Sequence, residues 1–272
     1  MSRWTTERLA WAATGGLGIV PPLAVVALAM YLGASGAAAW RQLPLTELAG
    51  TTWLPLGRHF GILPLLLGTA ASTALALLIA LPIGLTAALY LTLYAGPRIR
   101  PVADSGIALL GSVPSIVVGL WGMTWIVPAV GNSLAAATLV LALMITPTFT
   151  LLAGAALRQV PADVPEAVRS LGVSEDIAAW TVVRHAGWGI FGAASLAATR
   201  SLGEAVAVSM VAGNVGAMPT LSGPVATLTS TLIVEFDGAT GLHRSVLHLS
   251  ALIVMALIAI ISLLGRAMQR RR

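Results

Sequence analysis

Long uncharged apolar runs alternate with short charged segments along the chain. Charged residues are absent over 24 positions at 9–32, over 36 positions at 61–96 and over 53 positions at 105–157. A helix rises about 1.5 Å per residue, so about 20 apolar residues cross a hydrocarbon layer roughly 30 Å thick. The first run therefore predicts one transmembrane helix. The 53-residue run is long enough for two, with a turn expected at residues 128–133.

The pattern predicts an all-α polytopic membrane protein with six transmembrane helices. The first span and an external loop occupy residues 1–60, a core of five spans occupies residues 61–265, and a basic tail follows at 266–272. A cleaved signal peptide is the alternative for the first run, but its length and the Pro21-Pro22 pair favour a retained span. The expected spans are residues 9–32, 66–94, 105–128, 134–157, 189–213 and 245–265.

Composition agrees with a membrane location and excludes several classes of site. Hydrophobic residues make up 57% of the 272 positions and charged residues 9%. There is no cysteine, so disulfides, thiol nucleophiles and cysteine metal sites are excluded. The net charge is +5, but the arginines of the chain are dispersed among short loops and form no basic patch of the kind that binds nucleic acid.

The positions of the arginines predict the orientation in the membrane. Positive residues are retained on the cytoplasmic side of short loops. With both termini in the cytoplasm, eleven arginines lie in cytoplasmic segments and three, Arg41, Arg58 and Arg244, lie outside. This distribution predicts a multi-pass membrane protein with residues 158–188 in the cytoplasm.

Residues 158–188 form the one long polar interval between predicted spans. Seven of the 25 charged side chains lie here. Pro165 suits the first position of a helix, Gly172 suits a helix end, and Ser174 can cap a second helix. An ordinary polar loop is the alternative to this rigid pair of helices.

The order of residues in this interval resembles a known docking element. Glu166, Ala167 and Val168, with Gly172 four residues later, resemble the EAA loop by which permease subunits of bacterial ABC importers dock into their ATPase partner. The resemblance implies that Glu166, Ala167 and Gly172 serve ATPase coupling. The usual Ile-x-Leu-Pro continuation is replaced here by residues 182–185, which include Arg184 and His185.

Two charged residues fall inside the fifth predicted span. Arg200 is eleven residues into it, and an arginine at that depth costs roughly 2.5–3.5 kcal/mol to insert, so it is expected to face protein or a wet cavity. Glu204 follows one helical turn later, and the two side chains would share a face of a continuous helix. They could form a buried ion pair that fixes two helices together. They could also form an anion site, because guanidinium holds two oxygens of an oxyanion and a carboxylate can accept a hydrogen bond from the proton that phosphate carries and sulfate lacks.

The segment containing these charges resembles the PstC family of permeases from phosphate-specific ABC importers. The Arg-x-x-Gly-Glu signature is matched by Arg200, Gly203 and Glu204, although Ala205 stands where the family usually has threonine. Shorter matching segments occur in order at residues 60–64, 113–117, 144–148 and 227–230, so the resemblance covers about residues 60–265.

The resemblance implies a type I ABC importer permease fold and a transport function. The implied partners are a PstA-like sister permease in a heterodimer, a PstB-like ATPase dimer and an external PstS-like phosphate-binding protein, all around a chain embedded in membrane lipid. ATP and Mg²⁺ would be bound by the ATPase, and no cofactor or metal is expected on this chain. Arg200 and Glu204 would line the substrate path, and Ser115 and Thr146, each beside a proline, are further candidates.

Three alternatives remain at this point. An ABC permease could carry another oxyanion, such as molybdate, sulfate or phosphonate. A membrane-embedded hydrolase would need a nucleophile with a base or a metal-ligand cluster, and His243 and His248, five residues apart, are not a tight ligand pair. A membrane anchor that only scaffolds a complex would leave Arg200 and Glu204 without a role.

Overall fold

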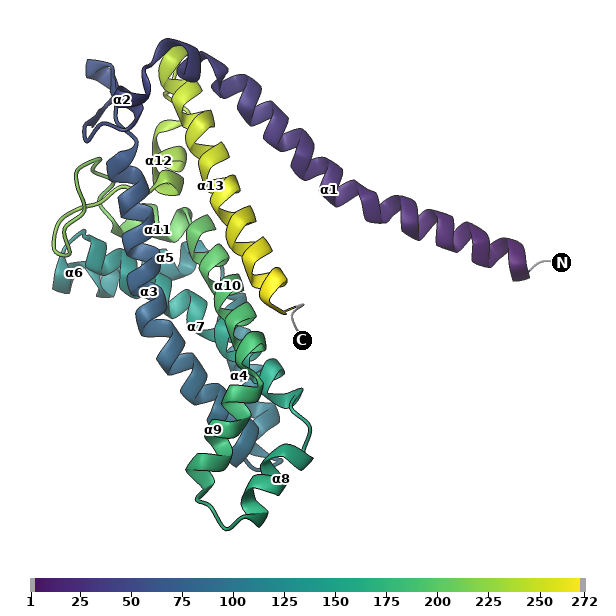
Figure 1. Ribbon diagram of the computed structural model, residues 1–272. Helices are drawn as coiled ribbons and strands as arrows, with labels where there is room; N and C mark the ends of the chain where they lie inside the picture. The colour runs from purple at the N-terminus through teal and green to yellow at the C-terminus, as the bar shows by residue number, and fades with distance from the viewer. Residues whose placement is uncertain (1–2, 270–272) are drawn as a thin grey trace.

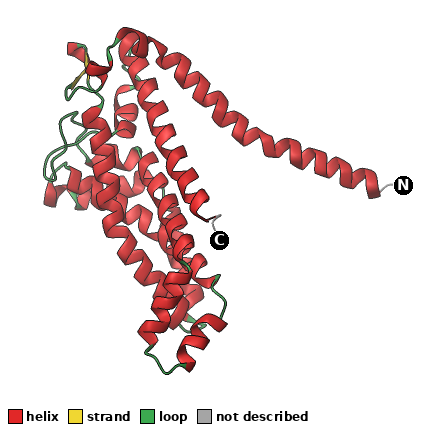
Figure 2. Ribbon diagram, in the orientation of Figure 1, coloured by secondary structure: helices red, strands yellow, loops and turns green. Residues whose placement is uncertain are grey.

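The computed structural model describes residues 3–269, with side chains from Gly18 onward, and this part of the chain is almost entirely helical (Figures 1 and 2). The exception is a small antiparallel hairpin of β1 (Trp53–Leu54) and β2 (His59–Phe60) around the 3-10 turn η1 (Pro55–Gly57). Short helix α2 (Leu45–Leu48) precedes the hairpin. The expected all-α class is confirmed.

Four helical segments within the described residues are long and apolar enough to cross a membrane, and a bent pair of helices makes a fifth. Six spans were expected. The four are the Gly18–Gln42 part of α1 (Arg3–Gln42), α3 (Leu63–Leu89) with its π-helical end η2 (Tyr90–Tyr94), α7 (Leu134–Arg158), and α13 (Gly241–Gln269). The bent pair is α4 (Ile99–Ser112) and α5 (Ser115–Trp125).

Helix α1 runs ten residues beyond the end predicted for the first span, through the beginning of the expected external loop. This part of α1 approaches α13 closely, since a Cβ at Gly36 would lie 3.3 Å from the Leu249 backbone nitrogen. The Ser245 hydroxyl of α13 donates to the Ser35 carbonyl (2.8 Å) and accepts from the Ala39 amide (3.0 Å). Toward its N-terminus α1 leaves the rest of the molecule (Figure 1).

The centre of the protein is the packing of α3 on α7. Phe149 of α7 is buried, and Gly84 of α3 leaves room for its ring, since a Cβ there would lie 2.6 Å from a ring carbon. Helix α10 (Gly187–Gly203) packs against α3, α7 and α13. These helices position the residues of the predicted substrate path.

The third expected span, residues 105–128, is a broken helix and not a straight one. Helices α4 and α5 meet at Pro114 with a bend of 86°. Proline has no amide hydrogen and disfavours helical backbone in the residue before it, so α4 ends and α5 restarts at Ser115. The turn expected at 128–133 is confirmed: short α6 (Val127–Val130) leads to Gly131, with φ +72°, and then to Ser133, whose hydroxyl oxygen caps α7.

The fifth expected span, residues 189–213, is also interrupted. Helix α10 ends at Gly203, and a separate short helix α11 (Val206–Val211) packs on α5. Gly119 of α5 makes this close packing possible, because a Cβ there would lie 2.9 Å from the Cα of Ala207. The one continuous helix predicted for this segment was therefore wrong.

Helix α12 (Leu228–Glu235) precedes α13 and begins inside the protein. Its first four residues are buried. A capping box between Thr227 and Ser230 satisfies its amino end, and the Leu228 amide donates to Thr69 of α3 (2.9 Å). The hydroxyl groups here replace water as hydrogen-bond partners, so the helix can begin inside the protein.

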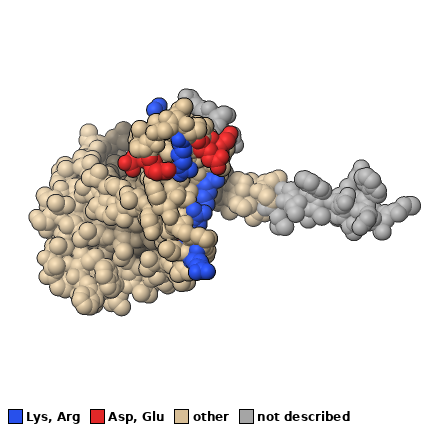
Figure 3. All heavy atoms as spheres, turned by 90° about the horizontal axis from the view of Figure 1, so that it is seen from below, with Lys and Arg blue, Asp and Glu red and all other residues tan. Residues whose placement is uncertain are grey.

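The helix, break and helix predicted for the polar interval are confirmed as α8 (Asp163–Ser170) and α9 (Glu175–His185). Gly172 adopts φ +73° between them, in the left-handed region that favours glycine. Pro165 is the third residue of α8 and not the first, and Ser174 stands at the cap position of α9 without a side-chain cap bond. Viewed from this end of the molecule, charged side chains gather together while the surrounding surface is uncharged (Figure 3).

Candidate functional site

Arg200 lies half-buried on α10, three residues before the helix ends, and its guanidinium reaches two other helices. One terminal nitrogen donates to Thr148 Oγ1 of α7 (2.8 Å), and the other donates to the Gly111 carbonyl of α4 (3.3 Å). The Gly111 carbonyl is among the last four of α4, which have no partner within the helix. The bend at Pro114 thus offers Arg200 an acceptor inside the apolar region.

The guanidinium lies on the wall of a cavity of about 260 Å³ between α4, α5 and α7. Arg200 is the one charged residue on this wall, which is otherwise apolar and includes Leu110, Trp121 and Pro147. The ion pairs formed by the described residues do not include Arg200. An arginine with neutral partners in an apolar cavity is suited to receiving an anion, because electrostatic attraction is stronger there than in water.

Glu204 does not share a helical face with Arg200. Helix α10 ends at Gly203, and Glu204 follows in an extended conformation (φ −76°, ψ 114°). Its carboxylate accepts a hydrogen bond from the Ala207 amide at the start of α11 (3.1 Å), and its backbone carbonyl accepts one from Thr229 of α12 (3.1 Å). The expectation of a paired face was wrong because it assumed a continuous helix, and the carboxylate lies at the break instead.

The two hydroxyl candidates differ in their surroundings. Thr146 donates to the Ala142 carbonyl one turn earlier in α7 (2.6 Å), so its hydrogen is used by its own helix. Ser115 is half-buried and is the first residue of α5, immediately after the bend. Its role and that of Thr146 in the path stay predictions.

The residues predicted to serve ATPase coupling lie on α8, α9 and the turn between them, which we call the coupling helices. Glu166 and Ala167 are exposed on α8, and Gly172 is exposed at the turn. Arg169 donates three hydrogen bonds of 3.0–3.1 Å to the Glu175 carboxylate across that turn. These bonds, with the negative charge of Glu175, raise the pKa of Arg169 above its ordinary value. The pair spans the turn between α8 and α9.

The sequence analysis missed several residues, both around Arg200 and on the coupling helices. Thr148 and Gly111 contact Arg200 but lie 52 and 89 positions away in the chain. On the coupling helices, the apolar side chains of Leu171 and Trp180 are 78% and 62% exposed. Large apolar side chains on a charged protrusion indicate a protein contact, and the apolar positions inside the polar interval were the available signal.

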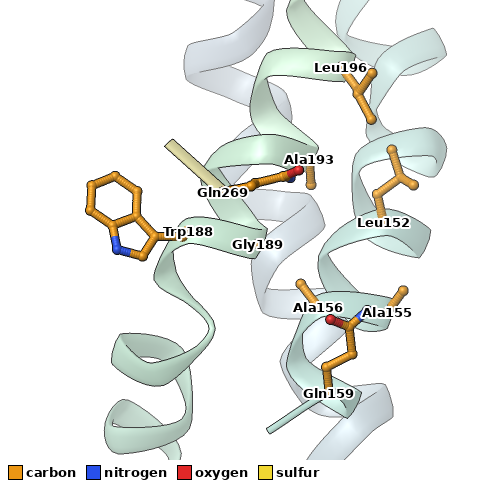
Figure 4. Close-up of a pocket in the computed structure, with 9 residues that line it drawn as sticks. All are labelled: Leu152, Ala155, Ala156, Gln159, Trp188, Gly189, Ala193, Leu196 and Gln269. Atoms are coloured by element: carbon orange, nitrogen blue, oxygen red, sulfur yellow. The ribbon is translucent and has the colours of Figure 1, made fainter. Parts of the chain in front are cut away.

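A second cavity, of about 340 Å³, lies nearer the coupling helices between α7, α10 and the end of α13. Figure 4 shows Gln269 reaching across α10 toward Ala193, while the indole of Trp188 points away from α7. The wall of this 340 Å³ cavity has two glutamine side chains but no charged one. It therefore offers less to an oxyanion than the cavity at Arg200.

The histidines considered for a metal have other partners. His243 Nε2 lies 2.8 Å from Glu235 Oε2, and the Trp53 indole donates to the other carboxylate oxygen, Oε1 (3.0 Å). His248 Nδ1 lies 2.7 Å from the Arg244 carbonyl. Among the described residues no group of three or more histidine, cysteine, aspartate or glutamate side chains could hold a metal ion.

Comparison with known proteins gives relatives over most of the chain. The Mycobacterium tuberculosis protein named phosphate transport system permease protein PstC 1 is 32% identical over 255 residues, which cover 80% of this chain and 74% of that protein. The Bacillus subtilis probable ABC transporter permease protein YqgH is 30% identical over 270 residues, covering 92% and 86%. A Mesorhizobium japonicum protein named phosphate transport system permease protein PstC is 29% identical over 280 residues, covering 90% and 84%.

The fold matches a solved transporter. A structure of the MetNI methionine ABC transporter in inward-facing conformations aligns with a TM-score of 0.58 at 22% identity, covering 78% of this chain and 94% of the matched chain. This similarity confirms the type I ABC importer permease fold. The family described as "Binding-protein-dependent transport system inner membrane component" matches residues 80–272. The chain therefore belongs to this family of inner-membrane transport components.

Proposed function

We propose that this chain is the permease subunit through which inorganic phosphate crosses the bacterial inner membrane, driven by ATP hydrolysis on a partner chain. The observation that carries the proposal is the guanidinium of Arg200, held by neutral partners on the wall of an apolar cavity. The names of relatives that match most of the chain add support for phosphate as the substrate. Molybdate, sulfate and phosphonate are the competing oxyanions.

Two groups would contact the anion in this proposal. Arg200 presents a planar fork of donors that matches two oxygens of a tetrahedral oxyanion. Glu204 lies outside the lining of this cavity, at the break between α10 and α11, and would accept a hydrogen bond from the proton that phosphate retains at neutral pH. One of its carboxylate oxygens already accepts from Ala207, which fixes the carboxylate at the break.

The chain also contains a direct connection from the coupling helices to Arg200. Helix α9 ends at His185 and α10 begins at Gly187, so a single residue separates them. Arg200 lies 15 positions beyond His185, roughly 22 Å along a helix at 1.5 Å per residue. A movement of α8 and α9 would therefore be transmitted along α10 to the cavity.

The family implies partnership with an ATPase and an external substrate-binding protein. We assign Glu166, Ala167 and Gly172, with the exposed Leu171 and Trp180, to contact with a PstB-like ATPase dimer that binds ATP and Mg²⁺. A PstA-like sister permease would complete the path as a heterodimer, and the exposed apolar side chains of α4 and α5 are suited to facing that partner or lipid. A PstS-like protein would deliver phosphate from outside.

The proposal is tested by ATP-dependent uptake of labelled phosphate into vesicles containing the complex assembled with its genomic neighbours. Sulfate and molybdate are added as competitors, and the wild type is compared with Arg200→Ala. We expect uptake that resists both competitors and falls at least 100-fold in the variant, since two hydrogen bonds from a charged group are lost and each contributes about 1.5–3 kcal/mol. Assembly and basal ATP hydrolysis serve as controls.

Two results would count against the proposal in different ways. An assembled, ATP-hydrolysing wild-type complex that takes up no phosphate would move the substrate to another oxyanion. Normal phosphate uptake by Arg200→Ala would remove Arg200 from the path and leave the family assignment unaffected.

A further inference from the structure

Three threonines lie at every second position of α7 around Pro147, and the middle one differs from the others. Thr146 donates to the Ala142 carbonyl (2.6 Å) and Thr150 donates to the Thr146 carbonyl (2.8 Å). Both make the usual bond of a helical threonine to the turn before it. Thr148 instead meets Arg200, at 2.8 Å from a guanidinium nitrogen.

The chemistry of this contact leaves one donor available. Guanidinium has only donors, so Thr148 Oγ1 must be the acceptor, through one of its two lone pairs. The hydroxyl hydrogen is not used in that bond. Within the described part of the chain, Thr148 makes no further side-chain hydrogen bond, in contrast to Thr146 and Thr150.

The position of Thr148 is suited to an anion held by Arg200. Its neighbour Pro147 lies on the wall of the 260 Å³ cavity together with Arg200. The second contact of the guanidinium, with the Gly111 carbonyl, is long at 3.3 Å. A charged oxygen would replace that neutral carbonyl favourably, while the shorter bond to Thr148 keeps the guanidinium in place.

We infer that Thr148 and Arg200 act as one anion-binding pair. The Thr148 oxygen fixes the orientation of the guanidinium, and the Thr148 hydroxyl hydrogen donates to a tetrahedral oxyanion bound in the cavity. The inference rests on the proposed oxyanion transport. It adds Thr148 as a hydroxyl donor, where the sequence offered Thr146 and Ser115 as the hydroxyl candidates for the path.

The test compares Thr148→Val, which keeps the shape but removes the hydroxyl, with Thr148→Ser, which keeps the hydroxyl. The matched control is Thr150→Val on the same helix, where the hydroxyl bonds only its own helix. Uptake of labelled phosphate is measured in vesicles at saturating ATP and binding protein, and is divided by the amount of assembled complex. We expect Thr148→Val to lower uptake about tenfold or more, Thr148→Ser to stay within about threefold of wild type, and Thr150→Val to match wild type.

Equal uptake by Thr148→Val and wild type would overturn the inference. Equal loss in the serine and valine variants would overturn it too, because packing and not the hydroxyl would then be responsible. If Thr148→Val fails to assemble, Thr148→Ala against Thr148→Ser carries the same comparison. A wild-type complex that transports sulfate or molybdate instead would refute the proposed phosphate function, and the variants would then be compared with that anion.

Discussion

Gly172 allows a prediction in which backbone strain acts alone. Its φ of +73° lies in the left-handed region, and a Cβ added there would meet no atom within 4 Å. Replacing it by alanine therefore introduces no clash. The left-handed conformation costs an L-residue roughly 1–2 kcal/mol, which is the whole expected effect on the turn between α8 and α9.

The interaction that resists this strain is weaker than the strain itself. The Arg169–Glu175 pair spans the same turn, but its side chains are 43% and 60% exposed. Exposed ion pairs of this kind add little stability. We therefore expect Gly172→Ala to open the turn about 5- to 30-fold more often than in wild type, the ratio that corresponds to 1–2 kcal/mol.

Hydrogen exchange of the α8 and α9 amides in the assembled complex measures this opening directly, and phosphate taken up per ATP hydrolysed measures its effect on coupling. The exchange of these amides and the phosphate taken up per ATP should both change in Gly172→Ala. Gly172→Asn should change them less, because asparagine tolerates the left-handed region. The control is Gly96→Ala in another loop, where a Cβ also meets nothing within 4 Å and φ is not positive. If Gly172→Ala and Gly96→Ala behave alike, backbone strain at this turn has no role in coupling.

The spans were predictable where hydropathy alone decides the structure. The runs at α3, α7 and α13 become long helices because lipid and the protein core both require their backbone groups to bond internally. The bend of 86° at Pro114 was not predictable in size. Proline explains why α4 ends, but the direction of α5 depends on the packing of Gly119 against α11, which comes from a distant part of the chain.

Arg200 could be identified from the free-energy cost of placing an arginine in the membrane, but the geometry of its site could not be predicted. An arginine in an apolar run must have partners, so Arg200 was identified from the sequence. Its actual partners, Thr148 and Gly111, lie on two other helices whose arrangement no local pattern specifies. The four-residue spacing of Arg200 and Glu204 wrongly predicted a shared face, because residues four apart are neighbours only within a continuous helix. Gly203 was a local hint of the break, since glycine is unfavourable inside a helix.

Two further substitutions separate packing from chemistry. A Cβ at Gly68 would overlap the Ala226 carbonyl oxygen, which is backbone and cannot move aside cheaply, so Gly68→Ala should lower stability by about 1–3 kcal/mol, seen as a lower melting temperature of the detergent-solubilised complex. Glu204→Gln addresses the proposed hydrogen bond from the phosphate proton to the carboxylate. The glutamine oxygen can still accept from the Ala207 amide, so the start of α11 and complex assembly should be unchanged. A neutral amide accepts a hydrogen bond about 1–1.5 kcal/mol less favourably than a carboxylate, so phosphate uptake should fall roughly five- to tenfold. Wild-type uptake by Glu204→Gln would show that the carboxylate serves only to cap α11, and the preference for a protonated oxyanion would then need another source.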